Sequence, residues 1–160
     1  IQIVYSEESE VLETGGGIKK ALPFFGNESF ICVNADIFTD FDFTDLKLGV
    51  DSNSLGKLIL VENPEHNHTG DFSLDCEGKL LPPSSTEPVN LTFSGISVLS
   101  PKLFDGFSDS KFRLADVFLK AISMGLLSGL KYDGAWYDVG SPERLNKLRQ
   151  EVGDLAGYKN

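Results

Sequence analysis

Apolar residues in the earlier part of the chain fall into short blocks of the kind that form strands. Residues 1–5 alternate between apolar and polar side chains, as in a half-buried strand. The runs at 29–33 and 57–61 are continuously apolar, which predicts strands covered on both faces. Residues 89–99 alternate for long enough to form a further strand, and Gly95 within it indicates a bulge or a close approach by a ligand.

Shorter stretches predict the remaining strands and loops. Residues 71–75 and 79–81 flank a Cys-Glu-Gly turn, which predicts a hairpin. The segment 135–139 predicts a short strand. Mixed aromatic and acidic residues at 38–48 indicate a loop that leads into a helix, and the Pro- and Ser-rich stretch at 82–86 indicates a second loop.

Three segments carry helix signals. Residues 18–22 predict a short helix that Pro23 stops. Apolar residues recur at helical spacing from Leu114 to Leu127. Ser141 opens the last helix as its N-cap, with a proline and an acid following in the first turn. Because strands and helices alternate in the first half and a hairpin lies in the middle, we expect an α/β fold with a mixed sheet.

Composition limits the partners that this chain can have. Its 160 residues, 41% of them hydrophobic, are enough for one domain or a large piece of one. The 24 acidic residues outnumber the 14 basic ones, giving a net charge of −10. Such acidity argues against a surface that binds nucleic acid or anionic lipid through phosphates. It does not argue against a site for one phosphorylated small molecule that binds together with a cation.

The chain shows no sign of secretion or membrane insertion. No apolar run approaches the roughly 18–20 residues needed to cross a bilayer, and no signal peptide is visible. Cys32 and Cys76 lie far apart, without the spacing of a zinc site or a disulfide framework. We therefore expect a cytoplasmic protein. The chain begins at Ile1, without a methionine and within a predicted strand, so we also expect a segment upstream of it.

Two acids stand at the ends of predicted strands. Asp36 follows the strand at 29–33, and Asp138 lies near the end of the strand at 135–139. Ligands of open α/β sheets gather at the carboxyl ends of strands. Two acids there can share a magnesium ion, which needs only one or two carboxylates when phosphate oxygens complete its coordination. The alternative is that each acid caps a helix or a turn, and the spacing leaves both interpretations open.

Other polar and aromatic groups allow two interpretations each. The glycines at 15–17 precede a predicted helix, where they let the backbone approach an anion; a plain turn is the simpler interpretation. His66 and His68, in a polar loop, are expected to be solvated rather than to bind zinc. Trp136 and Tyr137, beside the second acid, either stack against a ring or pack in the core.

Five segments, taken in order, resemble the motifs of one family. They are Glu13-Thr14-Gly15-Gly16-Gly17-Ile18, Val33-Asn34-Ala35-Asp36, Glu62-Asn63-Pro64-Glu65-His66-Asn67 with Gly70-Asp71-Phe72, Phe93-Ser94-Gly95-Ile96, and Trp136-Tyr137-Asp138-Val139-Gly140-Ser141-Pro142-Glu143-Arg144-Leu145. Together they resemble the sugar-1-phosphate nucleotidyltransferases. Within that family the chain most resembles the bacterial N-acetylmuramate 1-phosphate uridylyltransferases and the similar chains labelled mannose-1-phosphate guanylyltransferase.

The resemblance implies a fold and a reaction. The fold is the Rossmann-like nucleotidyltransferase fold, of which residues 1–160 would be the C-terminal portion of a single domain. The reaction joins a nucleoside triphosphate, UTP or GTP, to a sugar 1-phosphate and releases pyrophosphate. By the same resemblance, Asp36 and Asp138 are the catalytic carboxylates that bind Mg²⁺. The implied nucleotide-binding residues are Gly15, Gly16 and Gly17, and the implied substrate-binding residues are Asn34, Asn67, Gly70 and Gly95.

Two departures from the family pattern bear on activity. The family usually has Asn-Gly-Asp where this chain has Asn34-Ala35-Asp36. The family's first strand and glycine-rich loop, which bears the Arg and Lys that grip the triphosphate, are not in these 160 residues. We therefore expect no transferase activity from the chain alone, and an N-terminal fragment of the same domain as its partner. The alternative is a non-catalytic nucleotide-sugar-binding or regulatory subunit with a degenerate site.

Overall fold

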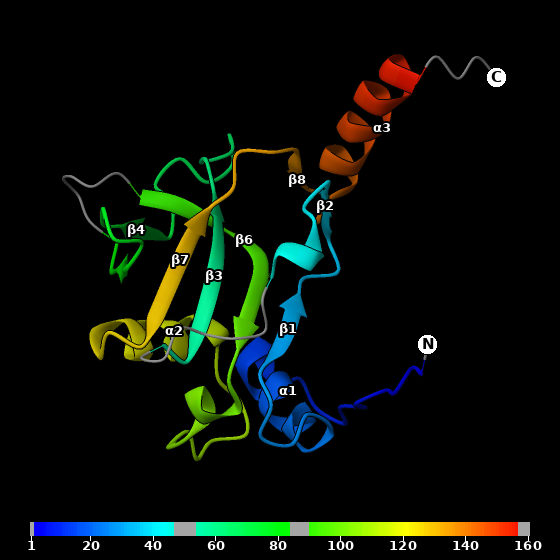
Figure 1. Ribbon diagram of the computed structural model, residues 1–160. Coiled ribbons are helices and arrows are strands. Elements are labelled where there is room, and N and C mark those ends of the chain that lie inside the picture. The colour runs from blue at the N-terminus through cyan, green and yellow to red at the C-terminus, as the bar shows by residue number, and fades with distance from the viewer. Residues whose placement is uncertain (1, 47–53, 84–89, 157–160) are drawn as a thin grey trace.

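The protein forms a mixed sheet with helical cover on one part of it, whereas the C-terminal helix extends away from the sheet (Figure 1). A computed structural model describes residues 2–46, 54–83 and 90–156. The helices are α1 (Glu13–Ala21), α2 (Leu114–Ser123) and α3 (Pro142–Ala156), and short 3₁₀ turns lie at Leu22–Phe24, Phe43–Asp45 and Pro101–Phe104. The strands are β1 (Phe30–Val33), β2 (Ile37–Thr39), β3 (Gly56–Val61), β4 (Phe72–Leu74), β5 (Leu80–Leu81), β6 (Asn90–Leu99), β7 (Leu127–Lys131) and β8 (Trp136–Asp138).

Six of these strands form the main sheet. Its order is β5-β4-β6-β3-β7, and β1 also pairs with β6. Strands β3 and β7 run parallel, whereas the other pairs are antiparallel, so the predicted mixed sheet is confirmed. The pairing of β3 with β6 changes register between Leu58 and Leu60, opposite the segment that contains Gly95. Gly95 has a φ of +82°, which confirms the predicted irregularity in this strand.

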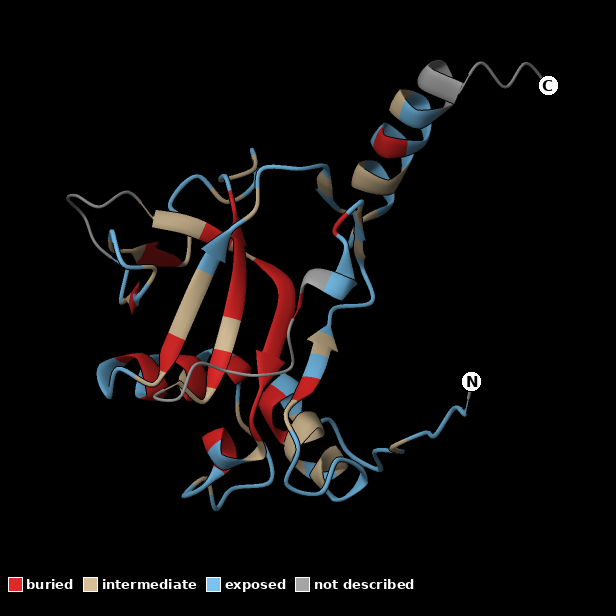
Figure 2. Cartoon of the chain, in the orientation of Figure 1, coloured by how far each residue is buried: buried red, intermediate tan, exposed pale blue. Residues whose placement is uncertain are grey.

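The core lies on both faces of β3. Leu58 and Leu60 belong to the cluster under α2, while Ile59 belongs to a second cluster on the other face, and all three are fully buried. This confirms the prediction for the run at 57–61. For the run at 29–33 the same prediction is wrong, because Ile31 and Val33 of β1 are 36% and 44% exposed. From α2, Phe118 packs edge-on against Phe93, with ring centroids 5.4 Å apart. Figure 2 shows the buried residues concentrated in β3, β6 and the inner side of α2.

Several predicted elements have the expected place. The hairpin of β4 and β5, the strand β8 and the start of the last helix are confirmed. Position 1 of the first predicted strand lies outside the described residues. So do positions 47 and 48 of the predicted loop at 38–48, the stretch 84–86 of the loop at 82–86, and residue 89. None of the helices in the described ranges combines the length and the apolar character needed to cross a bilayer.

The strand predicted at 1–5 is wrong over its described residues. Residues 2–8 form no strand, and the side chains of Ile3 and Tyr5 are 70% and 80% exposed. Alternation indicates which side chains a strand would bury, but a strand also needs a partner for its backbone groups. Within the ranges that the structure describes, this segment has none.

Two boundaries also differ from the prediction. Glycines 15–17 lie inside α1, so the interpretation of this stretch as a plain turn is wrong. Helix α2 ends at Ser123, and Gly125, with a φ of +68°, turns the chain out of the helix. Leu127 then begins β7, a strand that the sequence did not reveal. A short apolar run after a helix fits either the end of that helix or the start of a buried strand, because its side chains are buried in both cases.

The burial of Phe118 predicts a large loss of stability on truncation. Phe118→Ala should lower the free energy of unfolding by about 3–5 kcal/mol, because it leaves a cavity between α2 and the sheet. Leu119→Ala on the same helix is the control, since Leu119 is 40% exposed against 2% for Phe118. Urea unfolding followed by circular dichroism measures both, and equal midpoints for the two variants would contradict this assignment of the core.

Candidate active site

A two-stranded ribbon brings the two predicted carboxylates together. Strands β2 and β8 pair antiparallel, with Ile37 opposite Asp138. The backbone N–H of Val139 donates to the carbonyl of Asp36 at 2.8 Å. Asp36 precedes β2 and Asp138 ends β8, so both acids lie at the same end of the ribbon (Figure 1). They meet as the sequence predicted, but through this ribbon rather than at the edge of the main sheet.

The carboxylates converge at Gly140. A Cβ placed on Gly140 would lie 2.6 Å from Oδ2 of Asp36 and 3.1 Å from Oδ1 of Asp138. The first distance is shorter than any that a Cβ tolerates and the second is tight, so a side chain at position 140 would displace the Asp36 carboxylate. We call the space bounded by Asp36, Asp138 and Gly140 the carboxylate notch.

Positive and polar donors surround Asp138. Its Oδ1 accepts from the Gly140 N–H at 2.8 Å and from Nη2 of Arg144 at 2.9 Å. Its Oδ2 lies 3.0 Å from Nε2 of His66. Partial burial raises the pKa of Asp138, but the Gly140 N–H, Arg144 and His66 together outweigh it and hold the pKa below its ordinary value. Asp138 is therefore ionised at neutral pH.

The start of α3 places Arg144 against Asp138. The Ser141 hydroxyl accepts from the Arg144 N–H at 3.3 Å, which confirms the predicted N-cap. This cap sets the first turn of the helix, from which the Arg144 side chain reaches back. Its Nε donates to the carbonyl of Asp138 at 3.2 Å, so the guanidinium is held at two points of one residue.

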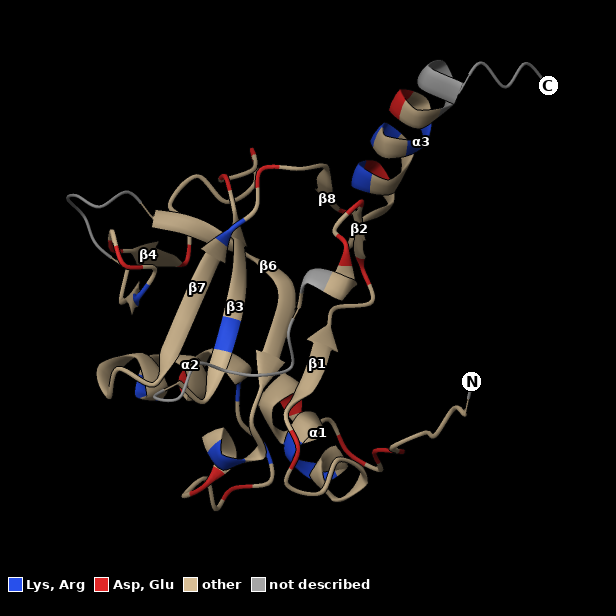
Figure 3. Ribbon diagram, viewed as in Figure 1, with Lys and Arg blue, Asp and Glu red and all other residues tan. Residues whose placement is uncertain are grey.

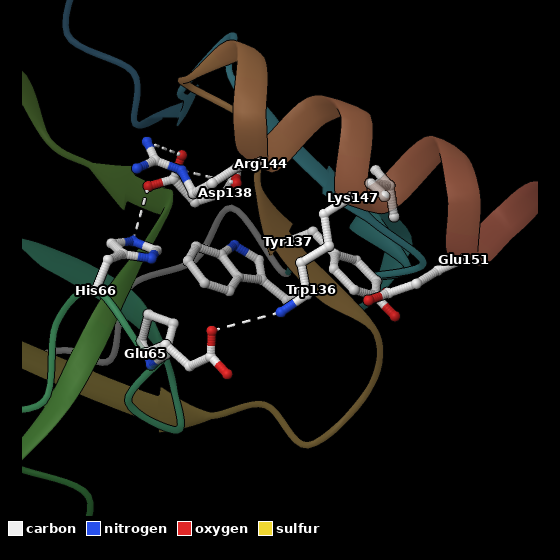
Figure 4. Close-up of a pocket in the computed structure, with 10 residues that line it drawn as sticks. Glu65, His66, Trp136, Tyr137, Asp138, Arg144, Lys147 and Glu151 are labelled. Carbon is white, nitrogen blue, oxygen red and sulfur yellow. Dashed lines mark hydrogen bonds and ion pairs between the residues drawn. The ribbon is translucent and has the colours of Figure 1, made fainter.

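A cavity of about 370 Å³ opens beside Asp138 (Figure 4). It is lined by the loop at 64–66, by β8 and by the inner side of α3. The indole of Trp136 forms part of its wall and donates to the carbonyl of Ser94 at 2.9 Å. On the other side Lys147 lies 3.4 Å from Glu65, so ion pairs connect the loop to α3. Trp136 is thus a fixed wall of a cavity, not a residue of either core cluster.

A second cavity of about 380 Å³ surrounds Asn34. Asn34 follows β1, and its N–H donates to the carbonyl of Gly95 at 2.9 Å. A Cβ on Gly95 would lie 2.9 Å from Cβ of Asn34, so the glycine allows the strands to approach here. Asp71 and Phe93 also line this cavity. The Asp71 carboxylate accepts from the Phe93 N–H at 2.8 Å, which fixes its orientation.

Two of the predicted substrate residues shape a loop. The Asn67 amide donates to Asp71 and to the hydroxyl of Thr92, both at 3.2 Å. Gly70 has a φ of +65°, and a Cβ there would lie 2.8 Å from Oδ1 of Asn63. Neither Asn67 nor Gly70 lines the two cavities described above. Their substrate contacts stay predictions, whereas their contacts in the structure hold the loop at 62–71 against β6.

The three predicted nucleotide-binding glycines pack inside the protein. A Cβ on Gly15 would lie 2.6 Å from the ring of Phe112, and one on Gly16 would lie 2.1 Å from the carbonyl of Ser110. Gly15 and Gly16 are buried, and Gly17 is partly exposed. Gly15 and Gly16 therefore allow α1 to pack closely on the segment at 110–112. Contact with a nucleotide stays a prediction.

Three site residues were missed from the sequence. His66 was expected to be solvated, but it contacts Asp138. Arg144 and Asp71 both stand in segments that resemble the family motifs, but the sequence assigned neither of them a role. The sequence held a signal only for Arg144, because a residue three positions after an N-cap lies in the first helical turn. His66 and Asp71 are brought to their sites by loop contacts that no local pattern predicts.

The carboxylate oxygens at the notch are ligands that suit a hard cation such as Mg²⁺ better than they suit zinc. Within the described ranges, no three His, Cys, Asp or Glu side chains are placed to share one metal ion. The notch instead offers oxygen atoms of two carboxylates, the ligand type that magnesium takes.

Comparison with curated proteins gives clear relatives, although no family model matches the chain. The chain is 41% identical to N-acetylmuramate alpha-1-phosphate uridylyltransferase of Neisseria meningitidis, over 96% of this chain and 68% of that protein. It is 30% identical to D-glycero-alpha-D-manno-heptose 1-phosphate guanylyltransferase of Campylobacter jejuni, over 89% of this chain and 64% of that protein. The chain thus spans about two thirds of the length of these relatives.

Solved structures share the fold. HddC from Yersinia pseudotuberculosis, also solved in complex with GMP-PN, matches with a TM-score of 0.71 and 23% identity, over 91% of this chain and 64% of that one. The inositol-1-phosphate CTP transferase of T. maritima matches with a TM-score of 0.69 and 16% identity, over 91% and 63%. These likenesses confirm the predicted Rossmann-like nucleotidyltransferase fold. Together with the identity to the Neisseria protein over most of the chain, they show that this chain belongs to the sugar-1-phosphate nucleotidyltransferase family.

Proposed function

We propose that this chain carries the metal-binding and sugar-binding part of an enzyme that transfers a nucleotidyl group to a sugar 1-phosphate. An oxygen of the sugar phosphate attacks the α-phosphorus of UTP or GTP, and pyrophosphate leaves, giving a nucleotide sugar. The observation that carries this proposal is the convergence of Asp36 and Asp138 at Gly140, in a chain 41% identical to a uridylyltransferase of this family.

The notch suits Mg²⁺ by the chemistry of its ligands. Both predicted ligands present carboxylate oxygens, and Gly140 adds no side chain at the point where they converge. Magnesium is commonly held by one or two carboxylates together with substrate phosphates. When bound, Mg²⁺ would neutralise charge on the phosphate groups of both substrates and act as a Lewis acid.

The chain's own residues contribute position and charge. The low pKa of Asp138 keeps this acid ionised, so that no proton has to leave before it acts as a ligand. A cation held at the notch would also explain how a chain with a net charge of −10 accepts anionic substrates, because the cation would attract them at that one place. Figure 3 shows that the sheet strands carry few charges and that acids lie mainly in loops.

The sugar is proposed to bind in the cavity around Asn34. Hydroxyl groups of a sugar pair well with an amide and a carboxylate, and Asn34 and Asp71 both line this cavity. Phe93 adds an apolar surface for the face of the ring. The names of the Neisseria and Campylobacter relatives support a uridine or guanosine nucleotide with a muramate or heptose phosphate. A uridylyl transfer to the muramate sugar would place the protein in cell-wall recycling.

Two further parts of the proposal concern the setting of the chain. A partner segment supplies the family signature that grips the triphosphate, since the relatives extend beyond the matched region.

We place the protein in the cytoplasm, because both of its cysteines, Cys32 and Cys76, are free thiols.

A pyrophosphate-release assay tests the proposed reaction. The chain is completed with the part of the Neisseria relative that lies outside the match, and UTP and GTP are paired with muramate, heptose and mannose 1-phosphates. We expect Mg²⁺-dependent turnover with at least one pair, and none from the 160-residue chain alone. Asp36→Asn and Asp138→Asn should each reduce turnover about a hundredfold or more.

The control for these variants is Asp109→Asn, which removes an exposed carboxylate that lines neither cavity. Its turnover should equal that of the unmodified protein. A full rate in Asp36→Asn would remove Asp36 from the proposed role. Turnover by the 160-residue chain alone would show that no partner segment is needed.

One observation favours a second function, a non-catalytic subunit that binds nucleotide sugars. Both oxygens of Asp138 already contact side chains of the protein, Arg144 and His66. A protein of this kind would bind a nucleotide sugar, which calorimetry measures, yet would release no pyrophosphate even in the completed form.

Gly140 offers a separate test of the notch. In Gly140→Ala the methyl group would meet only the ends of side chains, so the protein should fold normally. The two carboxylates must then move apart, and we expect the affinity for Mn²⁺, used as a probe for Mg²⁺, to fall about tenfold. Electron paramagnetic resonance of free Mn²⁺ measures this affinity. Asp109→Asn, which removes an exposed carboxylate outside the notch, is again the control; an unchanged affinity in Gly140→Ala would contradict a metal site in the notch.

A further inference from the structure

Arg144 places a positive charge at the carboxylate notch. Its Nη2 lies 2.9 Å from Oδ1 of Asp138 and 3.1 Å from the point where a Cβ of Gly140 would be. Oδ2 of Asp36 lies 2.6 Å from that same point. The guanidinium therefore contacts Asp138 directly and lies near the point at Gly140 toward which Asp36 also reaches.

The oxygen of Asp138 that faces the notch has no acceptor capacity left. A carboxylate oxygen has two lone pairs, and Oδ1 accepts one hydrogen bond from the Gly140 N–H and one from Arg144. The Gly140 donor is part of the backbone and is fixed. The Arg144 donor belongs to a side chain that is 36% exposed and that lines the 370 Å³ cavity, so it has room to move.

Resting on the proposed function, we propose that Arg144 is a positioning residue that holds Asp138 at the notch and is displaced from Oδ1 when a divalent cation binds. Removing Arg144 frees a lone pair and also removes a positive charge close to the site. Both effects favour the cation, so the guanidinium lowers the affinity of the notch for it. In exchange, it offsets the repulsion between two neighbouring carboxylates when no divalent ion is present.

Binding of Mn²⁺ to the 160-residue chain, measured by electron paramagnetic resonance at one fixed pH, tests this displacement. Arg144→Gln should bind Mn²⁺ about tenfold more tightly than the unmodified chain. Arg144→Lys restores the charge and should stay within about threefold of the unmodified chain. Arg149→Gln, an equal charge change at an exposed position of α3, is the control and should change the affinity less than about twofold.

Two further readouts separate displacement from a merely structural role. In the unmodified chain, addition of Mg²⁺ should shift the NMR signal of the Arg144 Nε–H, which donates to the carbonyl of Asp138. In EDTA, Arg144→Gln should melt at a lower temperature than Arg149→Gln, because two acids then face each other without a counter-charge. Circular dichroism confirms that each variant is folded. If Arg144→Gln is not folded, the response of the Arg144 Nε–H signal to Mg²⁺ in the unmodified chain carries the test.

The outcomes distinguish this inference from the proposed function. Equal or weaker Mn²⁺ binding by Arg144→Gln, with normal binding by the unmodified chain, overturns the role of Arg144 and leaves the metal site intact. Failure of both the unmodified chain and Arg144→Gln to bind Mn²⁺ overturns the metal site itself. A metal-independent Arg144 signal in a chain that binds Mn²⁺ also overturns the displacement.

Discussion

The pairing of β2 with β8 is the constraint on which the candidate site depends. Only three residue pairs form this ribbon, and two short strands are marginal on their own. Contacts with the rest of the protein therefore hold it. The indole of Trp136 donates to the carbonyl of Ser94 in β6 at 2.9 Å and so ties the ribbon to the main sheet. Within the ribbon, the hydroxyl of Thr39 adds a hydrogen bond to the carbonyl of Ala135 at 2.7 Å. Loss of this pairing would separate Asp36 from Asp138 and remove the notch.

The notch places two negative charges near each other. Groups next to Asp138 offset the resulting electrostatic repulsion. Gly140 contributes a backbone N–H, and Arg144 and His66 contribute side chains, all directed at Asp138. The overall acidity of the chain has little influence here, because exposed charges beyond about 10 Å are screened at ordinary salt. The acidic composition consequently describes the surface, whereas the proposed metal site depends on a few groups at one end of the ribbon.

The sequence predicted the parts of the fold that local signals determine. The buried strand β3 follows from its unbroken apolar run, and the start of α3 follows from Ser141 and the residues after it. Strand β7 was missed because its apolar residues continue a helical spacing. The family motifs identified Asp36 and Asp138, but the contacts of His66 and Asp71 arise from loops that join distant segments. No periodicity encodes such contacts, since they depend on how the loop at 62–71 folds against β6.

Ala35 stands where the family usually has glycine, and its backbone conformation shows whether this difference disturbs the site. Glycine at this position would matter most if the turn required a positive φ, which other residues adopt at a cost. Among the described residues other than glycine, only Glu13 has a positive φ, so Ala35 takes an ordinary backbone conformation. Asp36 still reaches Gly140 from this turn, with Oδ2 at 2.6 Å from the Cβ position. The substitution therefore adds a methyl group without displacing the carboxylate, and it is compatible with a functional notch.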